Sequence, residues 1–318
     1  MTTHRLHSIA AVAAVIWLLC AIAPVCGQSG VIRTRFFTVR YHSSDPFLAE
    51  IVADTAEEQL RRVAHDLDYP LKGIRRFPLN AYPNHYEFVK ASGLERRSSV
   101  VGTTRWGDEA ISVDAGAVLV STQEVLAHEI THAVVFRMLG STASQLPMWF
   151  SEGLAKYESR ESDSLDNDIM AKSAAENTLI PLPRLVSGFP EDSDALAYAE
   201  SAAAVRYLVR RFGKSAPRRI LRELKETGSF ERAMVSVTGL SPSQFTGKWY
   251  DWTTRRYAGF RLASILTALI SAFMAVLVVA AFLVRRKQKI EAARRWELEE
   301  AEAEASTPPW YGNPFPPC

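Results

Sequence analysis

One stretch of the 318-residue chain, LASILTALISAFMAVLVVAAFLV, extends from Leu262 to Val284 without a charged side chain. A helix needs roughly 20 apolar residues to cross a bilayer, and a core helix of this length with no polar face would be unusual. The basic segment RRKQK follows directly, and cytoplasmic segments next to a membrane are rich in Lys and Arg. The stretch therefore predicts a transmembrane helix over residues 261–284 and a cytoplasmic tail over residues 285–318.

The N-terminus is typical of a secretory signal. Arg5 and His7 precede an apolar run from Ile9 to Val25, and the run ends in small residues. We therefore expect a signal peptide over residues 1–27, followed by an extracytoplasmic domain over residues 28–260.

Arginines on both sides of the predicted span make its orientation less obvious. Arg255, Arg256 and Arg261 precede it and weaken the charge bias of the basic segment that follows. The signal peptide decides the orientation, with the C-terminus in the cytoplasm. We expect a single-pass protein of the cell membrane.

Composition restricts the classes of partner and of stabilising cross-link. The chain is 47% hydrophobic and 23% charged, as folded globular proteins are, and its net charge is only +2. Its Lys and Arg residues are scattered, so no nucleic-acid partner is expected. Cys20, Cys26 and Cys318 all lie outside residues 28–260. A disulfide within the domain is therefore excluded, and the domain must rely on its core and any bound metal.

Hydrophobic periodicity divides the domain into a β-rich first part and a helical second part. The predicted strands are residues 31–42 and 77–82 and a hairpin over residues 98–106 and 110–115. The predicted helices are residues 45–69, 83–92, 121–139, 147–157, 165–176, 195–212, 217–227, 230–238 and 241–256. Ser121 and Glu124 form a capping box at the start of one of them. We expect an α+β fold, in which an N-terminal lobe with an antiparallel or mixed sheet precedes a C-terminal helical lobe.

The segment HEITH lies on the helix predicted over residues 121–139. Residues four apart lie on one face of a helix, so His128 and His132 can present two imidazoles to one cation. Neutral imidazole suits zinc, and Glu129 is rotated so that its carboxylate lies beside a water on the metal rather than on the metal itself.

Two histidines do not complete a zinc site of this type. Catalytic zinc takes three protein ligands and leaves one position for water, so an acid must come from elsewhere. Glu152, on the next predicted helix, is the natural candidate. A chance His-Glu-x-x-His has a probability of roughly one in a hundred in a chain with seven histidines, which makes the pattern informative. His42, His65 and His85 have no partners at ligand spacing, and we expect them to be structural or surface residues.

HEITH, nineteen intervening residues and the acid in WFSEGLA together resemble the gluzincin zinc metallopeptidases. The segment PMWFSEGLA is similar to the corresponding segment of the aminopeptidase-like and peptidase-MA-like branch of the gluzincins. A weaker similarity to the peptidase-MA-like domain extends from about Phe36 to Trp252. One departure is Lys156, which stands where the thermolysin pattern has an aspartate that supports the histidines.

The resemblance implies a role for each of these residues. Zinc would be held by His128, His132 and Glu152, and Glu129 would act as general base and then as general acid in the attack of water on a peptide bond. A developing oxyanion needs a second stabiliser, which gluzincins often take from the helical lobe. Tyr198 is the candidate, with Tyr157 behind it.

The strand from Val100 to Arg105 resembles the gluzincin edge strand that pairs with extended substrate. An exposed edge offers backbone N–H and C=O groups to which a peptide can add as a further strand. The alternative is an edge that Arg105 protects and that no substrate uses.

These features predict a membrane-anchored, extracytoplasmic zinc peptidase that acts on peptides or proteins. One alternative is a catalytically inactive binding or scaffold protein that keeps the metallopeptidase fold at the membrane. Another is an amidase that acts on cell-wall or other non-protein amides.

Overall fold

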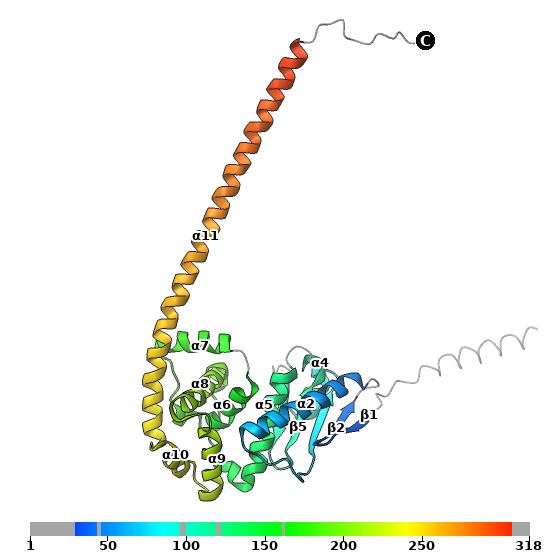
Figure 1. Ribbon diagram of the computed structural model, residues 1–318, viewed down its shortest axis with the longest axis vertical. Coiled ribbons are helices and arrows are strands. Elements are labelled where there is room, and N and C mark those ends of the chain that lie inside the picture. Colours follow the sequence, from blue (N-terminus) through cyan, green and yellow to red (C-terminus); the bar gives the residue numbers. More distant parts are fainter. Residues whose placement is uncertain (1–28, 43–45, 96–99, 119–121, 161–162, 307–318) are drawn as a thin grey trace, which may run out of the picture. The chain divides into compact units, whose positions relative to one another are not determined.

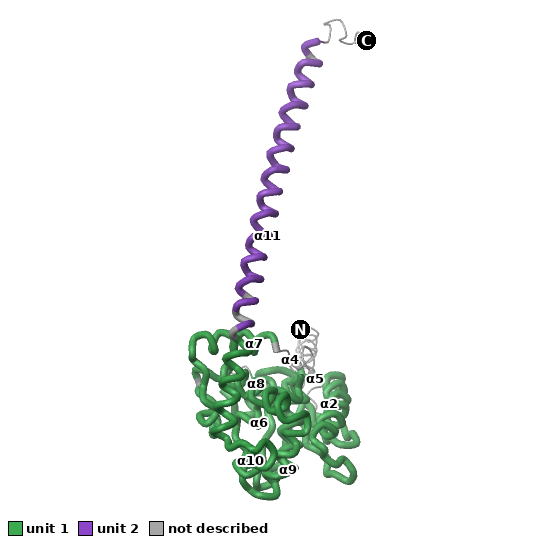
Figure 2. Tube along the Cα trace, turned by 60° about the vertical axis from the view of Figure 1, so that its left-hand side comes forward, with its two compact units in different colours: residues 1–257 green, residues 258–318 purple. Residues whose placement is uncertain are grey.

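The computed structural model describes the chain in five segments: residues 29–42, 46–95, 100–118, 122–160 and 163–306 (Figure 1). It divides into two compact units, residues 1–257 and residues 258–318 (Figure 2). The signal peptide expected over residues 1–27 and the capping residue Ser121 both lie outside the described residues.

Five strands of the first unit form one mixed sheet in the order β1-β2-β3-β5-β4. Their bounds are β1 Ser29–Arg33, β2 Phe37–His42, β3 Phe77–Tyr82, β4 Gly102–Arg105 and β5 Ala110–Asp114. The inner pairs β2–β3 and β3–β5 are parallel, whereas β1–β2 and β4–β5 are antiparallel. The predicted hairpin is therefore confirmed, and β4 forms one edge of the sheet.

The prediction of a single strand over residues 31–42 is wrong. The segment turns back on itself between β1 and β2, where the Thr34 amide donates to the Phe37 carbonyl at 3.1 Å. Glu57 holds this turn, since its Oε1 accepts from Thr34 Oγ1 at 2.6 Å and from the Phe36 amide at 2.7 Å. Glu57 is buried and lies on a helix more than twenty residues away, so the local alternation could not indicate the turn.

The helices of the first unit lie close to their predicted positions, except for the short helix α4, which was not predicted. Their bounds are α2 Phe47–Asp66, α3 His85–Ser92, α4 Ala115–Val118, α5 Thr122–Leu139, α6 Met148–Ser159, α7 Asp163–Glu176, α8 Asp194–Phe212, α9 Ala216–Thr227 and α10 Phe230–Thr238, and α11 begins at Pro242. Figure 1 shows α5 between the sheet and the group formed by α6, α8, α9 and α10, and α5 contacts members of both. The fold is α+β, as predicted, with a sheet lobe and a helical lobe.

The two lobes share one hydrophobic core. It includes Phe37, Phe77, Leu79, Ile111, Leu126 and Ile130, which lie in the sheet and in α5 and are at most 1% exposed. Because the inner face of α5 packs on β4 and β5 and its other side packs on α6 and α9, the helix has little freedom to shift.

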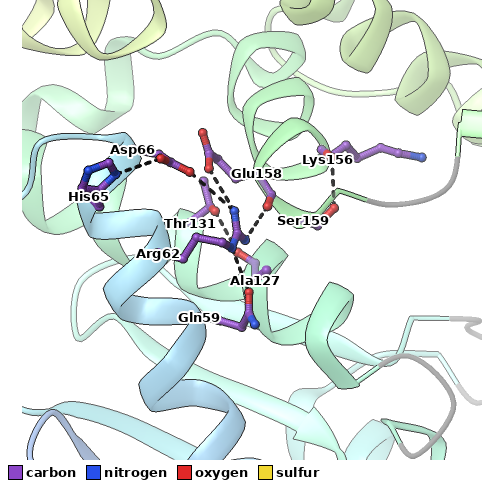
Figure 3. Close-up of polar contacts among 9 residues, drawn as sticks. All are labelled: Gln59, Arg62, His65, Asp66, Ala127, Thr131, Lys156, Glu158 and Ser159. Carbon is purple, nitrogen blue, oxygen red and sulfur yellow. Dashed lines mark hydrogen bonds and ion pairs between the residues drawn. The ribbon is translucent and has the colours of Figure 1, made fainter. Parts of the chain in front are cut away.

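A polar contact also joins α6 to α2 (Figure 3). The Arg62 guanidinium lies beside the C-terminal end of α6, where Nη2 donates to the Glu158 carbonyl and Nη1 lies 3.4 Å from Glu158 Oε2. Arg62 Nε donates to Gln59 Oε1 at 3.0 Å, which fixes the plane of the guanidinium. The end of α6 is therefore fixed to α2 as well as to α8.

Helix α11 extends from Pro242 to Ser306, so the predicted domain helix, the predicted membrane span and most of the predicted cytoplasmic tail form one helix. Proline is absent from its interior, and neither Gly247 nor Gly259 interrupts it. Its apolar part is long and hydrophobic enough to cross a membrane and is not buried within the structure.

Candidate metal centre

Helix α5 brings the two histidines of HEITH onto one face. The ring centroids of His128 and His132 are 4.9 Å apart, and the ring planes are inclined at 70°. This is the juxtaposition that a spacing of four residues on a helix predicts. His132 is also stacked on Phe136, with ring centroids 5.8 Å apart, which restricts the rotation of its ring.

Helix α6 supplies the third candidate ligand. Glu152 Oε2 lies 3.3 Å from His128 Nε2 and 3.5 Å from His132 Nε2. The ligand atoms of the three residues all lie within 4.8 Å of one another, a grouping that can hold a metal ion. The structure thus brings together residues that the sequence separates by up to twenty-four positions.

The donor set and its spacing fit zinc. Two ligands at about 2.0–2.1 Å from a tetrahedral zinc ion are separated by about 3.3–3.4 Å, which is close to the two observed N–O distances. Two imidazole nitrogens and one carboxylate oxygen are also a ligand set that zinc prefers, and three protein ligands leave a fourth position for water. The three residues therefore fit a catalytic type of zinc site.

The Glu152 side chain is kept in its anionic form. Burial by itself raises the pKa of this carboxyl group, but the neighbouring His132 and hydrogen bonds from His128 and His132 outweigh burial and hold the pKa well below its usual range. A metal ligand must be deprotonated, and the Glu152 carboxylate meets this condition. The two imidazoles would release their Nε2 protons when they bind zinc.

Close packing of α6 on α8 fixes the position of Glu152. A Cβ atom on Gly153 would lie 2.2 Å from the backbone oxygen of Ser201 and 2.8 Å from Val205 Cγ2. Only glycine allows the two helix backbones to approach this closely. The glycine of WFSEGLA therefore sets the distance between α6 and α8, and with it the placement of the adjacent carboxylate.

Ser151 supports one histidine in a way that the sequence analysis missed. Its Oγ lies 3.2 Å from His132 Nδ1. A hydrogen bond at Nδ1 orients the ring and leaves Nε2 facing Glu152. Lys156, which replaces the expected aspartate, instead donates to Asp166 Oδ1 at 3.0 Å. The only sequence signal for Ser151 was its position next to Glu152.

The Glu129 carboxylate is held by the edge strand β4. Thr104 Oγ1 lies 2.6 Å from Glu129 Oε2 and 2.9 Å from the Glu129 backbone oxygen. A Cβ atom on Gly102 would lie 2.9 Å from Glu129 Cγ and from Oε1, so the backbone of the strand lies directly against this side chain. Neither Gly102 nor Thr104 was identified from the sequence, although both lie on the predicted edge strand.

The two tyrosines considered as oxyanion stabilisers lie on different helices. The Tyr198 ring packs edge-to-face on Phe189, with ring centroids 4.9 Å apart, and belongs to α8, which packs on α6. Tyr157 lines a cavity with Asp66 and Glu158 on the side of α6 that faces α2. The role of Tyr198 as oxyanion stabiliser stays a prediction. Because Tyr157 lies on the side of α6 that faces α2, Tyr198 remains the preferred candidate.

A further acid on α8 is buried. Glu200 is 0% exposed, and its Oε1 accepts from the Ile180 amide at 2.7 Å, while its Oε2 has no hydrogen-bond partner among the described residues. Burial raises the pKa of Glu200 to about 8, against a smaller lowering by the Ile180 hydrogen bond. Sequence periodicity offered no sign of this acid, because the burial depends on the packing of α8.

The histidines set aside in the sequence analysis have other partners. His42 is stacked on Tyr82, and His65 and His85 lie 3.1 Å and 3.3 Å from carboxylate oxygens of Asp66 and Asp114, respectively. None of the three belongs to the candidate metal centre.

Known proteins resemble the chain in part. Residues 99–255 match the sequence profile of the Peptidase MA superfamily. No curated protein matches the chain in sequence. Solved structures with similar folds include an M1 zinc metallopeptidase from Deinococcus radiodurans, at 18% identity and a TM-score of 0.42 over 70% of this chain and 50% of that one. Another is a two-domain M1 zinc metallopeptidase variant bound to L-tryptophan, at 17% identity and a TM-score of 0.40 over 70% of this chain and 51% of that one.

The chain thus spans about half the length of those metallopeptidases. The sequence match covers the edge strand, the helix with HEITH, the segment WFSEGLA and the helical lobe. The resemblance inferred from these motifs is therefore confirmed by the family match: residues 99–255 are similar to the Peptidase MA superfamily.

Proposed function

We propose that this protein is a membrane-anchored, extracytoplasmic zinc peptidase of the gluzincin type. The observation that carries the proposal is the convergence of His128, His132 and Glu152 on one point. Glu129 follows His128 directly on α5. A zinc ion bound there would lower the pKa of a water ligand and polarise the scissile carbonyl.

Glu129 and Tyr198 are proposed to carry out proton transfer and oxyanion stabilisation, respectively. Glu129, positioned by Thr104, accepts a proton from the attacking water and later donates it to the leaving amine nitrogen. The C–N bond of the peptide breaks, and the products are a carboxylate and an amine. Tyr198 is proposed to donate a hydrogen bond to the developing oxyanion.

The substrate is proposed to bind along β4. This strand lies at the end of the sheet, where it pairs with β5 on one side and forms the edge of the sheet on the other. A peptide that adds to the free edge would lie next to Thr104, which contacts Glu129. An extended peptide or protein segment is therefore the proposed substrate.

Helix α11 is proposed to anchor the domain in the cell membrane, with residues 28–260 outside and the C-terminus in the cytoplasm. Its exposed apolar part supports the span, and the basic segment after Val284 supports the orientation.

The experiment compares the wild-type full chain with Glu129→Gln, both purified in a neutral detergent and assayed on a broad peptide library. We expect about one zinc per chain in both proteins and a loss of hydrolysis of about 100-fold or more in the variant. Equal activity of the two proteins would contradict the proposed role of Glu129. A wild type that binds zinc and cleaves nothing would favour the inactive binding protein. Cleavage of non-peptide amides alone would favour the amidase.

A further inference from the structure

A cavity of ≈ 850 Å³ lies in the first unit, between the end of α8, the turn after α10 and the first part of α11. Its size is within the range of sites for small-molecule ligands. Five cationic side chains line it: Arg210, Arg211, Lys248, Arg255 and Arg256. Asp251 is the one carboxylate among the lining residues, so the lining carries a net charge of +4.

Helical spacing explains how so many cations meet. Lys248, Asp251, Arg255 and Arg256 follow one another at intervals of three, four and one along α11, which places them on one face of that helix. Arg210 and Arg211 lie in the last turn of α8. The two groups therefore face each other across the cavity.

Aromatic rings between the two helices fix this arrangement. Tyr207 of α8 and Trp252 of α11 have ring centroids 5.3 Å apart. The Arg256 guanidinium lies over the Trp252 ring, 5.4 Å from its centroid. A guanidinium stacked on an aromatic ring keeps its N–H groups free to donate at its edge.

The five cations differ in their ion pairing from other arginines of the first unit. Within the described part of the chain none of them forms an ion pair, whereas Arg61, Arg62, Arg75, Arg137 and Arg222 of the same unit all do. Neighbouring like charges repel, so an unpaired cluster of this kind opposes the compact state unless an anion binds. The aromatic contacts nevertheless hold the cluster together.

We propose that this cavity binds a phosphate group. Guanidinium groups pair with phosphate through two parallel hydrogen bonds, and a cluster of Arg and Lys is the usual protein surface for such an anion. Two sources share this chemistry, a soluble phosphate and the headgroup of an anionic phospholipid.

The position of the cavity along the chain favours the lipid. Arg256 precedes Leu262, the start of the charge-free stretch, by six residues, and six residues span at most about 22 Å. If residues 261–284 cross the bilayer, as proposed above, the cavity lies within reach of the lipid headgroups. Basic residues next to a membrane span are usually enriched on its cytoplasmic side, whereas Arg255 and Arg256 precede the span on the proposed outer side. Binding of lipid headgroups would give these two arginines a role there.

The test uses the full chain in a neutral detergent. Short-chain phosphatidylglycerol, phosphatidylcholine and inorganic phosphate are added separately, and bound molecules are counted by native mass spectrometry. We expect phosphatidylglycerol to bind about tenfold more tightly than phosphatidylcholine, because only the former carries a net negative charge.

The cavity variant combines Arg210→Gln, Lys248→Gln and Arg255→Gln. All three side chains are exposed, so the triple variant is expected to fold. If it does not fold, the single variant Lys248→Gln takes its place in the test. We expect phosphatidylglycerol to bind at least about tenfold more weakly to the triple variant and measurably more weakly to the single one.

The matched control removes three other exposed cations of the same unit, Lys172→Gln, Arg219→Gln and Lys225→Gln. It is expected to bind phosphatidylglycerol as the wild type does. If inorganic phosphate binds as tightly as phosphatidylglycerol and is lost in the cavity variant, the site belongs to a soluble ligand and the proposal of a lipid ligand is wrong. Binding that is unchanged in the cavity variant, or equally weakened in the control, would overturn the site itself. Peptidase activity enters none of these readouts, so the result is independent of the proposed reaction.

Discussion

Gly153 offers the sharpest test of how the helical lobe positions the metal centre. In Gly153→Ala the new Cβ would lie 2.2 Å from the Ser201 backbone oxygen and 2.6 Å from its carbonyl carbon. Ordinary van der Waals contact begins at about 3.4 Å, so α6 and α8 must separate locally by about 1.2 Å. The obstacle is backbone rather than a flexible side chain, which means that rotamer changes cannot relieve it.

The expected cost follows from this separation. Overpacking a well-packed core costs about 1–3 kcal/mol or more, and replacing a helical glycine by alanine returns at most about 1 kcal/mol. We expect a net loss of about 1–3 kcal/mol in the free energy of unfolding, which corresponds to a decrease of about 2–12 °C in Tm. Because Glu152 is adjacent, its carboxylate moves with α6, and zinc affinity should fall as well.

The assay combines thermal unfolding of the full chain in detergent with a zinc competition titration. Gly247→Ala is the matched control, since Gly247 is also helical but has nothing within 4 Å of the position that a new methyl group would take. The control should be neutral or stabilised by up to about 1 kcal/mol. If Gly153→Ala melts with the control and binds zinc as the wild type does, the contact between α6 and α8 does not set the geometry of the site.

Three further substitutions address single contacts. Ser151→Ala removes the hydrogen bond to His132 Nδ1 and should weaken zinc binding about 10- to 100-fold in a chelator competition, whereas Ser151→Thr should retain most of the affinity. Thr104→Val removes the hydroxyl next to Glu129 Oε2 and should lower kcat about tenfold at unchanged zinc content; an unchanged kcat would show that β4 does not position the base. For Glu200 the folded-state pKa of about 8 lies above the unfolded value of 4.5, so the folded state binds more protons between these pH values. Stability of the wild type should therefore fall, by up to about 1.4 kcal/mol per pH unit, as pH rises from about 4.5 to about 8. Glu200→Gln should lack this slope in thermal melts, and parallel profiles for the two proteins would contradict the buried acid.

Local periodicity predicted most of the elements correctly because their packing agrees with it. The residues over 77–82 alternate between core and partial exposure, and this alternation alone identified β3. Helix α10 has its N-cap at Ser229 and its left-handed C-cap at Gly239, both next to the predicted ends. Where a distant residue decided the conformation, as Glu57 does at the turn after β1, the prediction was wrong.

The sequence by itself determined the chemistry that the site can offer. The spacing of His128 and His132 places them on one helical face whatever the rest of the chain does, because the periodicity of a helix is local. The same locality made the charge-free stretch before Val284 recognisable as a candidate span. The next predicted helix offered Glu152 as the third ligand, and the family resemblance supported this choice, although no local rule connects Glu152 to the histidines.

The tertiary structure decided the distances and the supporting contacts. The 3.3 Å between His128 Nε2 and Glu152 Oε2 depends on how α6 packs on α5 and α8, and that packing depends on a glycine whose absent side chain matters only once the helices meet. Thr104 and Ser151 likewise acquire their roles by contact across elements. Such contacts join residues far apart in the chain or on different helices, and no spacing within the sequence encodes them.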